Sequence, residues 1–85
     1  MNGIPMVNIN GTSMAFLVKS RITAREALLD ASRALSECRP HGRDYQTAPK
    51  GEYEIARARH EERFALIDRI INELGDEAVL IQDQA

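Results

Sequence analysis

The chain has 85 residues, of which 44% are hydrophobic and 28% are charged, and its formal net charge is -2. A chain of this length forms one domain that buries only about 60 to 65% of the surface of its unfolded state, so we expect a narrow stability margin for a monomer. The composition excludes wholesale disorder, and the slightly acidic balance disfavours a nucleic-acid coat that is held by a broad basic field.

Nine of the eleven basic residues are arginine, whose rigid guanidinium binds carboxylates and phosphates through two parallel hydrogen bonds. The single Cys38 cannot close an intrachain disulfide, and no Cys/His spacing resembles a zinc site, so we expect neither a metal nor another cofactor. No stretch approaches the roughly 18 apolar residues of a membrane span, and the N-terminus lacks the pattern of a cleaved leader. The sequence therefore predicts a protein of a reducing cytoplasm.

The first predicted element is a helix over residues 13–38, after an irregular segment 1–12. Either Thr12 or Ser13 can accept a hydrogen bond from the first amides of this helix. Thr23 and Glu26 also have capping-box spacing, so the helix could instead restart there after a break. Residues at helical spacing form its predicted apolar stripe, which consists of Leu17, Ala24, Leu28, Ala31, Leu35 and Cys38. The charged residues Arg25, Asp30, Arg33 and Glu37 are predicted to project away from this stripe.

The second predicted helix covers residues 52–75. The connection 39–51 separates the two helices. Arg39-Pro40 should end the first helix, and Pro49 and Gly51 stand just before the second. Gly75 is a plausible C-cap, and we favour further helix over a strand for the extension 76–85. The apolar stripe of the second helix is the strongest periodic pattern in the chain, and it consists of Tyr53, Ala56, His60, Phe64, Ile67, Ile71 and Leu74.

The fold class that follows is all-α, an antiparallel hairpin of two long helices. Each helix also has apolar residues outside its stripe, namely Phe16, Val18 and Leu29 in the first and Ile55, Leu66 and Ile70 in the second. Another copy of the chain would cover them, so we expect a symmetric homo-oligomer. The alternative is a monomer in which residues 1–11 and 76–85 fold over this surface.

The connection "RPHGRDYQT", residues 39–47, is unusually rich in hydrogen-bonding groups. In the functional interpretation, Arg39 and Arg43 bind phosphates, Tyr45 stacks on a base, and Asp44 orients Arg43, with His41 beside them. In the structural interpretation, Asp44 ties the backbone of the turn, Tyr45 packs on the helix ends, and Gly42 supplies a positive φ. Further candidate ligand-binding residues are Asn10, Thr12 and Ser13, because a helix start offers unpaired amides.

The segment "RARHEER" of the second helix adds a candidate. Arg63 borders the apolar stripe, so its charge should meet either a carboxylate or a ligand phosphate where the hairpin packs. Arg57 and Glu61 have the spacing of an ion pair, and His60 is expected to be buried in an interface rather than to act as a base. Nothing orients His41, His60 or Cys38 for catalysis, and we predict that the protein is not an enzyme.

The stretches "NINGTS", "HGRDYQ" and "EIARARHEERFALIDRIINEL" resemble a set of short phage and prophage-encoded proteins in which NGTS-like and GRDY-like motifs flank a helical hairpin. The resemblance covers roughly residues 8–75. It implies a phage origin, and hence the cytoplasm of a bacterial host, rather than a particular chemistry. Many of those proteins have a second aromatic residue where this chain has Gln46.

These observations favour a small phage protein that sequesters an anionic nucleotide-type signal of bacterial immunity, without catalysis. One alternative is an inhibitor or adaptor that binds a host enzyme through a helix face. A weak nucleic-acid-binding accessory protein is the second alternative, and the acidic balance disfavours it.

Overall fold

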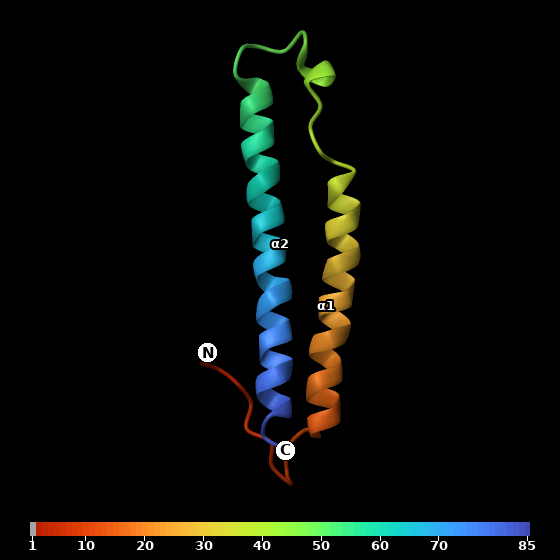
Figure 1. The fold of residues 1–85 in the computed structure, drawn as a ribbon, viewed down its shortest axis with the longest axis vertical. Helices are drawn as coiled ribbons and strands as arrows, with labels where there is room; N and C mark the ends of the chain where they lie inside the picture. Colours follow the sequence, from red (N-terminus) through yellow and green to blue (C-terminus); the bar gives the residue numbers. More distant parts are fainter. Residues whose placement is uncertain (1) are drawn as a thin grey trace.

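The structure, a computed structural model, describes residues 2–85 and consists of two long antiparallel helices (Figure 1). Helix α1 covers Met14–Ser36, a short 3-10 helix η1 covers Gly42–Tyr45, and helix α2 covers Glu52–Gln82. The described residues contain no strand. The prediction of an all-α hairpin of two long helices is confirmed.

Helix α1 begins where its capping residue predicts. The Ser13 Oγ accepts a hydrogen bond from the backbone N–H of Phe16 at 3.2 Å. The helix then runs unbroken past Thr23, so the predicted alternative of a second start there is wrong. It ends at Ser36, slightly before the predicted residue 38, and the N–H groups of Glu37, Cys38 and Arg39 donate turn-type bonds to carbonyls three residues earlier.

Helix α2 begins at Glu52, as predicted, after Gly51 in the left-handed conformation with a φ of 93°. Gly75 does not end it, and the prediction of a C-cap there is wrong, because α2 continues to Gln82. The residues after Gly75 explain the continuation, since Ala78, Ile81 and their neighbours carry the apolar stripe two turns further. The extension is therefore mostly helix, as favoured from the sequence.

The two helices pack along a seam with spacings of three and four residues, as in a coiled coil, and the spacings alternate except between Ala56, His60 and Phe64, which are separated by four residues each. The predicted stripe of α2 is confirmed, and every seam residue is buried or half-buried. The α1 side of the seam consists of Met14, Val18, Arg21, Arg25, Leu28, Ser32 and Leu35. The α2 side consists of Tyr53, Ala56, His60, Phe64, Ile67, Ile71, Leu74, Ala78 and Ile81.

The predicted stripe of α1 is partly wrong. Ala24, Ala31 and Cys38 are exposed, and Arg21 and Arg25 occupy the seam instead. Arginine stems are apolar, so they can line a seam if the charged ends find room. The Arg21 Nε lies 3.5 Å from the Glu77 carboxylate, an ion pair without hydrogen-bond geometry.

Arg25 finds its room at Gly75. A Cβ added to this glycine would lie 3.3 Å from the Arg25 Nε and 3.7 Å from its Cδ. The arginine therefore crosses α2 where the helix has no side chain. The prediction that Arg25 projects away from the hairpin is wrong for this reason.

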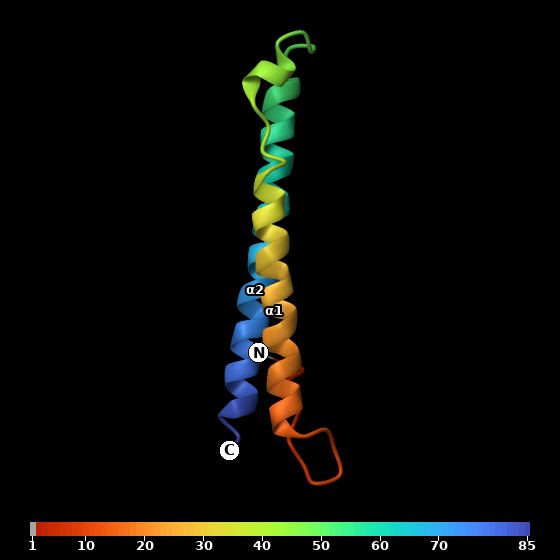
Figure 2. The ribbon, with the colours of Figure 1, turned by 90° about the vertical axis from the view of Figure 1, so that its right-hand side faces the viewer.

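The molecule is a rod that measures 63 × 22 × 17 Å, as the two perpendicular views show (Figures 1 and 2). Its radius of gyration is 18.7 Å, against about 12 Å for a compact domain of this length. The accessible surface is 6557 Å², whereas a compact chain of this mass exposes about 5,000 Å². The hairpin thus leaves roughly 1,500 Å² more surface in water than a globular protein of its size.

The N-terminal segment is attached to the end of α2. Gln84 accepts a hydrogen bond from the Val7 N–H at 2.9 Å, and its amide donates to the Pro5 carbonyl at 2.7 Å. This contact does not cover the apolar residues outside the seam, because Leu66 and Ile55 keep 55% and 51% of their surface exposed. The structure therefore differs from the alternative in which residues 1–11 and 76–85 fold over the apolar residues outside the stripes.

Candidate functional site: a cleft where α2 outruns α1

A cleft forms at the connection end of the hairpin because the two helices differ in length. At 1.5 Å per residue, α2 is roughly 12 Å longer than α1. The first turns of α2 therefore face the extended segment around Pro40 instead of a helix (Figure 1). An extended chain fills less space than a helix, and a cleft of about 500 Å³ remains.

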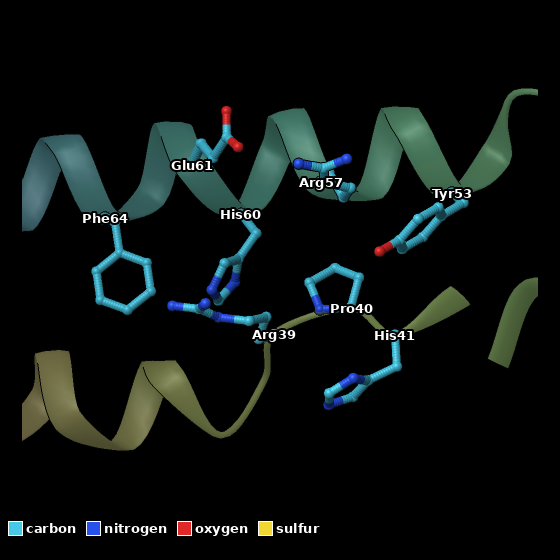
Figure 3. Close-up of a pocket in the computed structure, with 8 residues that line it drawn as sticks. All are labelled: Arg39, Pro40, His41, Tyr53, Arg57, His60, Glu61 and Phe64. Atoms are coloured by element: carbon cyan, nitrogen blue, oxygen red, sulfur yellow. The ribbon is translucent and has the colours of Figure 1, made fainter. Parts of the chain in front are cut away.

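Two chain segments line this cleft (Figure 3). Tyr53, His60 and Phe64 belong to the seam face of α2, and Arg57 and Glu61 each follow a seam residue, so they lie on one flank of it. In Figure 3 the Tyr53 and His60 rings point from α2 toward the opposite segment, and the Arg39 guanidinium lies beside the imidazole. The full lining is Arg39, Pro40, His41, Tyr53, Arg57, His60, Glu61 and Phe64.

His60 is the most unusual residue of the cleft. Only 6% of its surface is exposed, which confirms that it is buried. Neither ring nitrogen has a hydrogen-bond partner in the described part of the chain. Phe64 meets the ring edge-on, with centroids 4.8 Å apart, so it supplies packing but no polar contact. A buried polar group without a partner costs about 1 to 3 kcal/mol, and one that persists calls for an explanation.

Two guanidinium groups at the cleft, those of Arg39 and Arg57, have no ion-pair partner among the described residues. The ion pairs within residues 2–85 are Arg21–Glu77, Arg33–Asp30 and Arg69–Glu73, and they include neither Arg39 nor Arg57. The predicted pair of Arg57 with Glu61 is absent. Arg57 instead lies over the Tyr53 ring, 5.8 Å from its centroid, as a cation–π contact.

Tyr45 packs beside Tyr53. Its ring centroid lies 5.6 Å from that of Tyr53, and the residue is half-buried. Arg43 and Asp44 are exposed and do not line the cleft, and the turn is held by the bond from the Asp44 N–H to the His41 carbonyl at 3.0 Å. Gly42 does not adopt the predicted positive φ, which occurs at Gly3 and Gly51. The interpretation of the connection as a packed turn therefore fits Tyr45, and of residues 39–47 only Arg39, Pro40 and His41 line the cleft.

The other predicted ligand-binding residues lie elsewhere. Asn10, Thr12 and Ser13 precede α1 at the end of the rod opposite to the connection, and the Ser13 hydroxyl already caps the helix (Figure 1). Arg63 is exposed and forms no ion pair with a carboxylate among residues 2–85; it precedes Phe64 and so lies on the flank of α2 away from Arg57 and Glu61. The predicted set does not form one site within a single chain.

The structure adds Tyr53, Arg57, His60, Glu61 and Phe64 to the site. The signal that could have found them was the helical spacing of Tyr53, Arg57, His60 and Phe64, since residues three and four apart share a face. No pattern in the sequence indicates that Arg39 lies opposite them, because this depends on where α1 ends.

The cleft brings together cationic and aromatic groups. Two cations, an imidazole and aromatic rings can hold an anion that carries a ring. No group of metal-ligating side chains occurs among residues 2–85, and neither helix there is long and apolar enough to cross a membrane.

Comparisons with protein families, with curated proteins and with solved structures found no match for this chain.

Proposed function

We propose that the protein is a non-catalytic capture module that binds an anionic, ring-bearing ligand of the nucleotide type in the cleft at the connection end of the hairpin. The observation that carries this proposal is the buried imidazole of His60 beside the guanidinium groups of Arg39 and Arg57, because among residues 2–85 the imidazole has no hydrogen-bond partner and the two guanidinium groups have no ion pair. A ligand would satisfy all of these groups together.

Each cleft residue has a role in this proposal. Arg39 and Arg57 contact phosphate oxygens, and each charge-assisted bond contributes about 1.5 to 3 kcal/mol when water is excluded. The Arg39 side chain belongs to an exposed residue, so it can move aside and uncover His60. Tyr53 and Phe64 offer ring faces or edges to the ligand's ring, for about 1 to 3 kcal/mol. Arg43 and Tyr45 are not needed for binding.

The biological setting rests on the resemblance to phage and prophage proteins. A phage protein of this kind would act in the bacterial cytoplasm as an anti-defence sponge, lowering the concentration of a nucleotide signal by binding it. Such a sponge needs no catalysis, and it works as a homo-oligomer that presents several equal sites. The surface of the rod, roughly 1,500 Å² above that of a compact protein, supports self-association.

Native mass spectrometry of protein purified from bacteria, followed by calorimetric titration, tests the proposal. The first measurement reports retained small molecules, and the second uses a panel of mono-, di- and cyclic nucleotides. Arg39→Ala and Arg57→Ala should each weaken binding at least tenfold. Arg43→Ala is the matched control, since it removes a nearby exposed guanidinium that lies outside the cleft.

Two outcomes would contradict the proposal. In one, no nucleotide binds. In the other, Arg43→Ala weakens binding as much as Arg57→Ala, which would move the site to the connection itself.

The second candidate function is an adaptor or inhibitor that binds a host protein. The observation that favours it is the exposure of large apolar residues on the flanks of the rod, among them Phe16 at 62% and Leu66 at 55%. A helix face of this kind can occupy a groove of another protein. Capture of the same host protein by wild type and by Arg57→Ala, with no nucleotide bound, would favour this function over the first.

A further inference from the structure

One side of the rod has a stepped surface. Four alanines of α1, Ala24, Ala27, Ala31 and Ala34, each immediately precede a seam residue, and so do Leu66 and Ile70 of α2. In an antiparallel pair, positions one before the seam lie on the same side of both helices. We call the first set the alanine row and the second set the leucine ridge.

The step is visible in the exposure of these residues. Leu66 and Ile70 keep 55% and 41% of their surface in water, although both are large and apolar. The alanine row is exposed throughout, and its first part borders a shallow hollow of about 450 Å³ that is lined by Phe16, Lys19, Ser20, Thr23, Ala24 and Ala27. The α2 half of this side therefore stands out, while the α1 half is low.

The heights of the two sets match along the rod. Arg21 contacts Glu77 and Arg25 passes Gly75, so these pairs stand level. Counting along both helices from these contacts at 1.5 Å per residue, Leu66 stands roughly level with Ala31 and Ala34, and Ile70 with Ala27 and Ala31. The large side chains thus occur at the heights where the neighbouring helix has only methyl groups.

We propose that a second copy of this chain docks on this side, related by a twofold axis parallel to the rod. The leucine ridge of each copy then packs into the alanine row of its partner, and the four helices form one bundle. A twofold contact of this kind is self-complementary, since the same surface serves on both copies. A twofold axis parallel to the rod also keeps residues at the same position along the rod opposite each other, so Leu66 and Ile70 of one copy face the alanines of the other.

The area supports this occupant. A stable interface buries about 800 Å² on each partner, and the rod exposes roughly 1,500 Å² more than a compact chain of its mass. One such contact fits within that excess. Arg57 and Glu61 follow seam residues and therefore lie on the other side, so both clefts stay open and lie at the same end of the bundle. The inference deepens the homo-oligomer of the proposed function, on which it rests, by naming its surface.

Sedimentation equilibrium of the full chain over a range of concentrations tests the surface. The expected mass for wild type is twice 9.5 kDa. Ala31→Glu and Leu66→Asp should each weaken the dimer at least a hundredfold, because each buries an unpaired charge in the contact. Ala15→Glu is the matched control, since Ala15 is equally an exposed alanine of α1 but lies on the other flank. Circular dichroism establishes that each variant keeps its helices.

A cross-linking experiment tests the axis. In a Cys38→Ser background, chains with Ala31→Cys and chains with Leu66→Cys are mixed and oxidised. The parallel twofold arrangement predicts a disulfide-linked dimer of one chain of each kind, while each variant alone should cross-link at least tenfold less. A wild-type monomer, a dimer that Ala31→Glu leaves intact, or equal cross-linking of each variant alone would overturn the inference. Nucleotide titration of the same variants is independent of these results, so a monomer that still binds ligand would remove the dimer and leave ligand capture standing.

Discussion

Replacement of His60 by leucine separates a binding role from a packing role. In the free protein the imidazole is 6% exposed and both nitrogens lack a partner in the part of the chain that the structure describes, so a leucine of similar volume removes a polar group that folding leaves unsatisfied. We expect His60→Leu to raise the free energy of unfolding by about 1 to 3 kcal/mol. For 85 residues this corresponds to a rise in Tm of roughly 5 to 15 °C.

The same substitution should lower ligand affinity at least tenfold, because the ligand loses its contact with the imidazole. Stability and function therefore change in opposite directions, which is expected of a binding residue and not of a core residue. Thermal unfolding by circular dichroism at one protein concentration, with and without ligand, measures both effects. The control is His41→Leu, whose ring points away from α2 in Figure 3 and whose effect on stability should stay within about 0.5 kcal/mol. If His60→Leu lowered Tm, the imidazole would have a stabilising partner, and the basis of the proposed site would be lost.

Three further substitutions test the packing. Ile71→Ala should destabilise the protein by about 2 to 5 kcal/mol in urea unfolding, because Ile71 is buried at the centre of the seam, and a loss below 1 kcal/mol would mean that the helices separate there easily. Ser13→Ala should cost about 0.5 to 2 kcal/mol through loss of the cap on Phe16, and hydrogen exchange should locate the change in the first turn of α1. Phe64→Asp should destabilise by several kcal/mol, since the charge would lie in the seam beside His60, and an unchanged melting curve would show that this position is open to water.

Periodicity predicted α2 better than α1, and the reason lies in the seam. All the α2 stripe residues from Tyr53 to Leu74 pack inward as predicted, because the seam of this helix is mostly apolar. In α1 the seam includes Arg21, Arg25 and Ser32, which a hydrophobic pattern cannot identify. The alanines on the flank then imitated the stripe, since they have the same spacing as the true seam and are shifted by one residue.

The site was harder to predict than the fold. The sequence drew attention to "RPHGRDYQT", yet only Arg39, Pro40 and His41 of that stretch line the cleft. Their partners come from α2, and the contact arises because α1 stops at Ser36 while α2 starts at Glu52. Predicting it requires the alignment of the two helices, which neither composition nor motif spacing contains.

That alignment is encoded far from the cleft, at Arg25 and Gly75. The connection of residues 37–51 is long enough to let one helix slide along the other by a heptad, a shift of about 10.5 Å. Counted from the level pairs, Ser36 stands beside about residue 63 of α2, so α2 extends roughly 16 Å beyond α1 at the connection end, and such a slide would shorten this overhang to about a third in one direction and lengthen it by about two thirds in the other. Only the observed alignment gives the Arg25 side chain the gap at Gly75 and brings Arg21 to Glu77. A glycine that weakens the middle of a helix thus selects one alignment out of several similar ones and, through it, the dimensions of a site several turns away.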